Sequence, residues 1–197
     1  MPPLLNDERR LLLELARQAV LEAVLHGSLL VVPPVSGELA KPSGVFVTLR
    51  RRRRLRGCIG QVEPVDPLAH AAVHCAMAAA LDDPRFEAVR PAELPELDIE
   101  ISRLSPMMPI TLREIEIGRH GLLISCGWQR GLLLPQVAAQ FGWTAERFLE
   151  ETCVKGGFEP DAWKDPGSRV EAFTAEIFSE AELRAEAPAD ERRARAG

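Results

Sequence analysis

The sequence contains no tyrosine, and aromatic residues make up only 5% of its 197 positions. Proteins that hold single-stranded nucleic acid usually stack the bases on aromatic side chains, so this scarcity argues against that class of function. The net charge of −5 also argues against a chain that coats nucleic acid or an anionic membrane with its whole surface. No apolar run approaches the roughly 18 residues of a membrane span. Residues 1–10 carry charges of both signs before any apolar stretch, unlike a signal peptide, so we expect no membrane association.

The four cysteines never form a Cys-x-x-Cys pair; they are Cys58, Cys75, Cys126 and Cys153. This spacing favours neither a zinc ribbon nor a dense disulfide framework, and it suits a reducing compartment, so we expect a cytoplasmic protein. The glycine-rich dinucleotide fingerprint, the P-loop and the Gly-x-Ser-x-Gly motif are also missing, which leaves nucleotide-binding and serine-hydrolase functions without motif support. We therefore expect no cofactor.

The pattern of apolar and turn-forming residues predicts an α+β fold, in which an antiparallel sheet is flanked by helices. Hairpin-forming strands and blocks of helices alternate along the chain. We predict helices over 6–27, 66–81, 135–141 and 144–155, and strands over 44–49, 55–62, 97–102, 122–125, 130–134 and 170–178. We expect residues 1–180 to form a single domain, and the charged tail 181–197 to be a frayed helix or disordered.

The segment Leu55-Arg-Gly-Cys-Ile-Gly60 is the first candidate site. Side chains alternate between the two faces of a strand, so Arg56 and Cys58 should share one face. A neighbouring cation favours the thiolate form of a cysteine, which a nucleophile requires. Gly57 and Gly60 would allow another group to approach the backbone closely. The alternative is a buried, unreactive cysteine beside a bulge, which is common in proteins.

Five consecutive arginines, Arg50 to Arg54, form the strongest charge feature of the chain. They could hold phosphate or an acidic partner. Alternatively, they form a solvated hairpin tip whose like charges discourage pairing with another strand. The net negative charge of the chain favours this second interpretation and makes nucleic acid an unlikely partner.

Three histidines are candidates for metal ligands or catalytic groups. His70 and His74 are four residues apart on a predicted helix, a spacing that suits two ligands of one metal ion. No third ligand lies nearby in the sequence, so we expect a chance pair and no metal site. His120 precedes a predicted strand and could act as an acid or base, although a lone histidine is more often a loop residue with one hydrogen bond.

Several segments together resemble the AMMECR-type domain family. The signature hairpin matches Gly44-Val-Phe-Val-Thr-Leu49 followed by Leu55–Gly60. Further blocks follow in the family's order: Asp83–Phe86, Glu93–Ser102, Ile117–Leu122, Gly131–Ala138, Gly142-Trp143, Cys153–Gly157 and Asp161–Asp165. The resemblance covers about residues 7–180, and ordered blocks are far more specific than any single motif.

The resemblance implies an α+β fold with two subdomains, the larger one built on an antiparallel sheet, and a cleft bordered by the Arg-Gly-Cys-Ile-Gly strand. Prokaryotic members resemble component A of the AmmeMemoRadiSam set, which implies a Memo-like protein and a radical-SAM enzyme as partners. The all-arginine hairpin connection departs from the family, whose members usually have a polar turn with glycine there. Any phosphate-binding role of these arginines would therefore be particular to this chain.

Three hypotheses about function follow. In the first, the chain is an enzyme or enzyme subunit that binds a small anionic substrate in the cleft, with Cys58 as nucleophile and His120 as acid or base. The substrate-binding residues would be Arg56, Gly57, Gly60, Glu100 and Gln136. In the second, the same groove is a non-catalytic adaptor surface for the Memo-like or radical-SAM partner. In the third, which we rank last, Arg50 to Arg56 bind nucleic acid.

Overall fold

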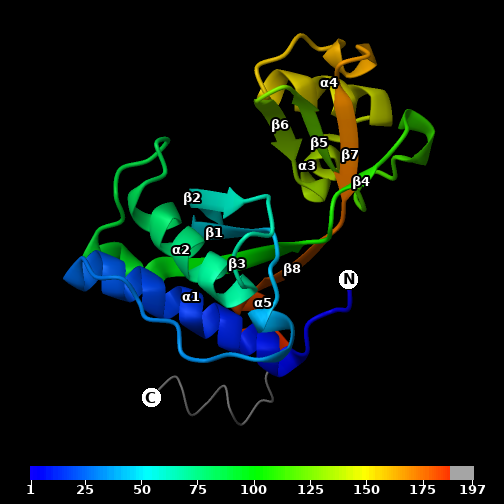
Figure 1. Cartoon of the computed structure of the whole chain (residues 1–197). Helices are drawn as coiled ribbons and strands as arrows, with labels where there is room; N and C mark the ends of the chain where they lie inside the picture. Colours follow the sequence, from blue (N-terminus) through cyan, green and yellow to red (C-terminus); the bar gives the residue numbers. More distant parts are fainter. Residues whose placement is uncertain (187–197) are drawn as a thin grey trace. The chain divides into compact units, whose positions relative to one another are not determined.

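The computed structural model describes residues 1–186, which divide into two compact units (Figure 1). Among the described residues, unit 1 comprises 1–103 and 176–186, and unit 2 comprises Leu104–Ala175. Unit 1 is therefore discontinuous in sequence, with unit 2 inserted between its two parts. Both units combine antiparallel strand pairs with helices, which confirms the predicted α+β class.

Unit 1 begins with the long helix α1, Asn6–His26. Its apolar residues recur at helical spacing, and Leu12, Ala16 and Ala19 are among those that become buried. The helix ends as predicted at Gly27, which adopts the left-handed conformation with φ of 62° and binds the last free carbonyl groups. The second helix, α2, spans Leu68–Leu81.

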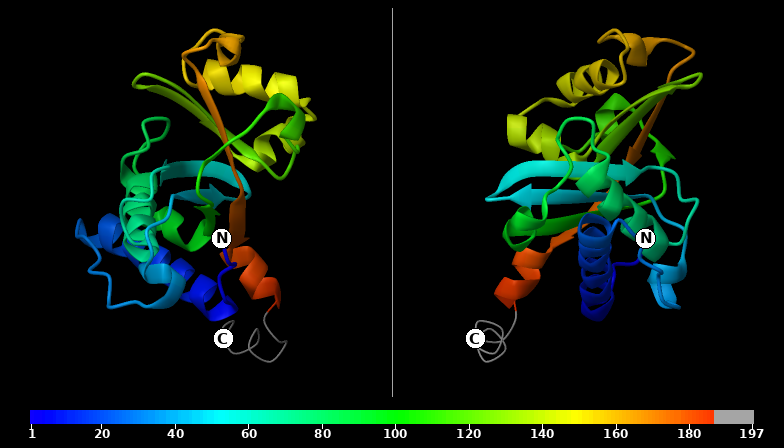
Figure 2. Two further views of the ribbon diagram at one scale, coloured as in Figure 1. Left: turned by 45° about the vertical axis from the view of Figure 1, so that its right-hand side comes forward. Right: turned by 90° about the vertical axis from the view of Figure 1, so that its left-hand side faces the viewer.

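The sheet of unit 1 has the strand order β2-β1-β3-β8, so β2 is an edge strand. Its strands are β1 (Val45–Arg51), β2 (Arg54–Gln61), β3 (Leu97–Leu104) and β8 (Ala175–Ser179). Val45, Val47 and Leu49 alternate onto one face of β1 and are fully buried in a core shared with α1 and α2. The two helices cover this face of the sheet (Figure 2). Phe46, Thr48 and Arg50 consequently lie on the opposite face.

Unit 2 is built on a second sheet with the order β4-β7-β5-β6. Its strands are β4 (Met108–Pro109), β5 (Gly121–Cys126), β6 (Gln129–Leu133) and β7 (Arg169–Phe173), and its helices are α3 (Pro135–Phe141) and α4 (Ala145–Lys155). Leu122 and Ile124 of β5 pack against Phe148 and Leu149 of α4 to form the core of the unit. Thr144 caps α4 by accepting a hydrogen bond from the Arg147 amide, as its position before the helix predicts.

The predicted strand over 170–178 is in fact two strands in two different sheets. β7 ends at Phe173 and β8 starts at Ala175, so the chain leaves one sheet and enters the other at Thr174. The alternation shifts phase at Ala172-Phe173, but apolar and polar residues remain mixed through both strands, so the segment resembles one continuous strand.

Short helical segments complete the described chain. They are the 3₁₀ turns η1 (Gly37–Ala40), η2 (Pro91–Glu96), η3 (Leu112–Glu114) and η4 (Ala162–Lys164), and the helix α5 (Glu180–Glu186). Of the predicted tail, residues 181–186 belong to α5, and residues 187–197 lie outside the described residues. Within residues 1–186, every helix is too short or too polar to span a membrane.

Candidate functional site

Cys58 lies in the middle of the edge strand β2 and is half-buried. The strand register places it beside Thr48 of β1, which in turn lies beside Glu100 of β3. The Thr48 hydroxyl, in a buried residue, donates a hydrogen bond to the Cys58 Sγ over 3.3 Å. The thiol is thus oriented by a neighbouring strand and lies on the sheet face opposite the helices.

Asp83 and Arg85, from the segment after α2, hold the outer backbone edge of Cys58. The buried Asp83 carboxylate accepts a hydrogen bond from the Cys58 amide at 2.8 Å, and Arg85 donates to the Cys58 carbonyl oxygen at 3.1 Å. Arg85 also binds Asp83 through two guanidinium nitrogens, at 2.9 and 2.7 Å. At this one residue the ion pair therefore takes the place of a further strand, because it binds both the outward amide and the outward carbonyl group of Cys58.

The charges of this ion pair are strongly coupled. Hydrogen bonds from the Arg85 guanidinium hold the pKa of Asp83 well below its ordinary value, and the backbone amides of Cys58 and Arg85 act in the same direction. Burial of Asp83 opposes the shift but does not overcome it. Asp83 therefore remains a carboxylate at neutral pH, and it fixes a positive charge next to Cys58.

Gly57 and Gly60 flank Cys58 because neither position has room for a side chain. A Cβ on Gly57 would lie 2.0 Å from the backbone oxygen of Ala79 in α2, and a Cβ on Gly60 would lie 2.3 Å from the ring of Phe46. The first glycine allows the helix to pack directly on the strand, and the second allows an aromatic ring to cover it. The close backbone approach predicted for this segment is therefore made by the protein itself.

Arg56 does not reach Cys58 through any hydrogen bond or ion pair between the two described side chains. A bulge between Leu49 and Arg50 interrupts the register. The Arg56 guanidinium instead binds both carboxylate oxygens of Glu93, at 2.9 and 3.0 Å, and the carbonyl oxygens of residues 87 and 88. Arg56 thereby lowers the pKa of Glu93 to about 2. The cation beside Cys58 is Arg85, which reasoning from strand alternation missed.

Glu100 and the arginine run form a network of ion pairs. Glu100 binds Arg50 at 3.2 Å, and Arg51 binds both Glu93 and Glu96. Three glutamates thus neutralise part of the charge that the sequence concentrates in the hairpin. The side chains of Arg53 and Arg54 make no hydrogen bond or ion pair with any described residue.

The other two predicted site residues, His120 and Gln136, belong to unit 2. His120 accepts a hydrogen bond on Nδ1 from the Glu116 amide at 3.1 Å, so it closes a local turn. The Gln136 side-chain oxygen is buried and finds no hydrogen-bond partner among the described residues. Cys58, Gly57, Gly60 and Glu100 lie together in one sheet of unit 1, and no histidine among the described residues of unit 1 is hydrogen-bonded to Cys58.

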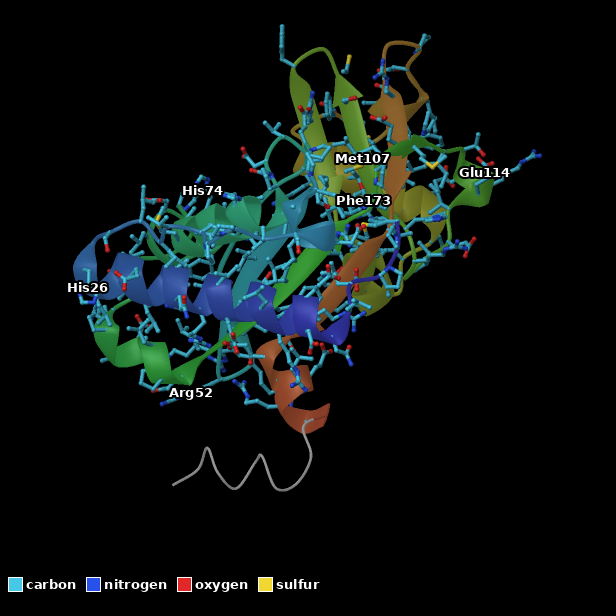
Figure 3. The ribbon with its side chains drawn as sticks, turned by 60° about the horizontal axis from the view of Figure 1, so that its bottom comes forward. His26, Arg52, His74, Met107, Glu114 and Phe173 are labelled. Atoms are coloured by element: carbon cyan, nitrogen blue, oxygen red, sulfur yellow. The ribbon has the colours of Figure 1, made fainter. Side chains whose placement is uncertain are left out.

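The His70 and His74 side chains are both exposed on α2 (His74 is labelled in Figure 3). Within residues 1–186, no group of three or more histidine, cysteine or acidic side chains is arranged to hold a metal ion.

The chain is similar to known proteins over the segments that build this site. The AMMECR1 family model matches residues 13–178. A protein of Methanothermobacter thermautotrophicus is 45% identical over 186 residues, covering 90% of this chain and 97% of its own length. Protein TK0174 of Thermococcus kodakarensis is 46% identical over 181 residues, covering 86% and 88%. The crystal structure of the uncharacterised protein PH0010 from Pyrococcus horikoshii is 43% identical, with a TM-score of 0.82 and coverage of 86% and 90%.

The matched range includes the Cys58 strand, the Asp83–Arg85 pair and all of unit 2. A match of this extent, with relatives similar over almost their whole length, places the chain in the AMMECR1 family.

Proposed function

We propose that this chain binds a small anionic substrate at the Arg-Gly-Cys-Ile-Gly strand and acts there as an enzyme or enzyme subunit. The observation that supports the proposal is the assembly around Cys58, in which a thiol, the Thr48 hydroxyl and the Arg85 guanidinium are fixed by hydrogen bonds between separate elements. The Arg85 side chain is 49% exposed, so part of its guanidinium can receive an anion from solvent. In this proposal Arg85 takes the anion-holding role that strand alternation assigns to Arg56.

A pair of alkylating reagents tests whether Arg85 guides an anion to Cys58. Iodoacetate and iodoacetamide transfer similar groups to a thiolate and release iodide, but only iodoacetate carries a negative charge. We expect the ratio of iodoacetate to iodoacetamide modification to be roughly 2–5-fold higher at Cys58 than at the exposed Cys126, as for an exposed charge pair worth up to about 1 kcal/mol. Mass spectrometry of each cysteine gives both ratios in one sample.

Arg85→Gln should remove the preference, and Arg85→Lys should retain part of it because the positive charge stays. The Cys126 ratio should be equal in all three proteins, and circular dichroism spectra would show that each is folded. An unchanged preference at Cys58 in Arg85→Gln would contradict the proposed anion-holding role.

The second candidate function is a non-catalytic adaptor. It is favoured by the local role of His120, whose Nδ1 accepts a hydrogen bond from the Glu116 amide and closes a turn within unit 2. Under this alternative, the Cys58 strand and the Asp83–Arg85 pair form a recognition surface.

A link to a Memo-like protein and a radical-SAM enzyme is part of both candidates, and its support is the family resemblance. Purification of the tagged chain from cells at natural abundance tests it. Cys58→Ala should abolish the cellular phenotype but keep partner binding if the chain is an enzyme subunit. If the Cys58→Ala protein lost its partners while the cellular phenotype stayed intact, the adaptor function would be contradicted.

Nucleic-acid binding by Arg50 to Arg56 is the least supported function, since three glutamates neutralise part of that charge.

A further inference from the structure

The β1–β2 hairpin carries a groove with a volume of about 550 Å³. None of the residues that line it belongs to the group around Cys58, Thr48 and Arg85. We call it the hairpin groove; its lining residues are Arg51, Arg52, Arg54, Leu55 and Arg56. Its volume falls within the range of about 300–1,000 Å³ that small-molecule sites occupy. Four of the five lining residues are arginines, which identifies the ligand class as anionic.

Some of these arginines are already fixed in position. Arg51 and Arg56 share the Glu93 carboxylate, at 3.2 and 2.9 Å, and Arg51 also binds Glu96. Hydrogen bonds to these glutamates raise the pKa of both arginines, so their charge is constant at any physiological pH. A ligand would therefore meet guanidinium groups whose orientation is set before it binds.

Other charges of the hairpin are not compensated. The Arg54 side chain, which lines the groove, makes no hydrogen bond or ion pair with any described residue. The six arginines of the hairpin meet three glutamates, Glu93, Glu96 and Glu100, which leaves a surplus of three positive charges. A ligand with about three negative charges would balance this surplus.

The hairpin turn supports the groove at a conformational cost. Arg52 and Arg53 both adopt positive φ, 51° and 66°, a left-handed conformation that residues with a Cβ disfavour and that Asn-Gly normally supplies in such turns. Arg52, labelled in Figure 3, uses this conformation to reach Glu96 from the end of the hairpin. Unfavourable backbone at a charged groove is typical of a binding feature.

A compact ligand fits these observations better than nucleic acid. None of the residues that line the groove is aromatic, so bases have nothing to stack on there. Glu93 and Glu96, which bind arginines that line the groove, would repel an extended phosphate backbone, whereas a short anion can stay among the arginines. Linked tetrahedral phosphates present acceptor oxygens in several directions, which suits guanidinium groups at successive positions along the hairpin. A carboxylate has only two acceptor oxygens, which lie in one plane, and therefore fits this arrangement less well.

From these features we infer that the hairpin groove binds a compact oligophosphate, either free or as the phosphate chain of a small molecule. The inference goes beyond the proposed function, because Cys58, Thr48 and Arg85 take no part in it. Each can therefore fail without the other: the alkylation ratios report on Arg85, and phosphate binding reports on the hairpin.

Isothermal titration calorimetry of the full chain with inorganic tripolyphosphate tests the inference. We expect saturable binding to one site, with orthophosphate and citrate each at least tenfold weaker. Arg54→Asn should weaken tripolyphosphate binding about tenfold, which corresponds to about 1.4 kcal/mol. The Arg54 side chain has no hydrogen-bond or ion-pair partner among the described residues, so its replacement should leave the fold intact.

Arg53→Asn is the matched control. It removes the same charge from the same hairpin, at a position that does not line the groove and where asparagine tolerates the positive φ. We expect it to weaken binding less than threefold. If the two variants weakened binding equally, the hairpin would act only through its net charge. This result would refute the groove as a specific binding site.

Two further outcomes would overturn the ligand class. Orthophosphate or citrate that binds as tightly as tripolyphosphate would exclude recognition of linked phosphates. A ten-residue oligouridylate that binds more tightly than tripolyphosphate, and that both variants weaken equally, would assign the hairpin to nucleic acid instead.

Discussion

Replacement of Asp83 by alanine should destabilise unit 1 more than any other single carboxylate change in the Cys58 region. Asp83 accepts four hydrogen bonds, from the Cys58 amide and from the amide and two guanidinium nitrogens of Arg85. An amide that loses its buried partner costs about 1–3 kcal/mol. The Arg85 side chain is 49% exposed and regains water, so the ion pair itself adds little. We therefore expect a loss of about 2–3 kcal/mol.

Urea unfolding measures this loss separately in the two units. All three tryptophans lie between residues 128 and 163, so tryptophan fluorescence follows unit 2. Circular dichroism at 222 nm is dominated by the helices, of which α1 and α2 in unit 1 are the longest. Asp83→Ala should lower the midpoint measured by circular dichroism. Asp82→Ala, which removes an exposed neighbouring carboxylate, should change stability by less than about 0.5 kcal/mol.

The pH dependence provides an independent check. The pKa of Asp83 is lower in the folded protein than in the unfolded chain, so its charge stabilises the fold above the ordinary carboxyl value of about 4. This contribution is lost progressively as the pH falls below that value. The stability gap between the wild type and Asp83→Asn should therefore be constant near pH 7 and narrow below pH 4. A loss under about 1 kcal/mol for Asp83→Ala, or a gap that widens in acid, would refute the role of the ion pair.

Three further substitutions probe other features. Gly57→Ala should cost about 1–3 kcal/mol by urea unfolding, because its Cβ would lie 2.0 Å from a carbonyl oxygen of α2, whereas Gly167→Ala meets ordinary contact distances and should cost much less. Glu96→Gln should raise the affinity for tripolyphosphate in calorimetry, because it removes a negative charge beside the hairpin groove while Glu93 still holds Arg51; unchanged affinity would contradict the contribution of net charge to binding. Thr144→Ala should destabilise α4 by about 1 kcal/mol in fluorescence-monitored unfolding, since the Arg147 amide loses its cap; no change would show that water replaces it.

Local sequence signals predict most elements of the fold but not the sheet to which each belongs. The helix that ends at Gly27 and the hairpin around the arginines follow from turn-forming residues and from periodicity. The passage from β7 to β8 does not, because alternation records only that each strand has a buried face. A single residue, Thr174, separates two strands that contribute to different cores.

The sequence indicates the segment on which the candidate site is built, but not the residues from elsewhere that surround Cys58. The segment around Cys58 stands out because two glycines interrupt a strand, and both prove to be sterically required. Arg56 was a poorer inference, because a bulge disturbs the alternation on which it depends. Arg85 and Asp83 come from a segment 25 positions away that pairs with Cys58 only after α2 has packed. No spacing rule connects such residues, although the Asp83–Phe86 block was already visible.

The insertion of unit 2 has a consequence for the order in which the chain can fold during synthesis. Ser105 and Thr174 join the two ends of the insertion through hydrogen bonds of 2.9 Å in each direction, between the neighbouring strands β3 and β8. Every residue of unit 2 is therefore synthesised before the last strand of unit 1 is complete. Until then β3 has an unpaired edge, and α1 lacks Glu176, which binds Arg9 and the Leu4 amide. A chain that ends near residue 175 should consequently expose this strand edge and aggregate more readily than the full chain.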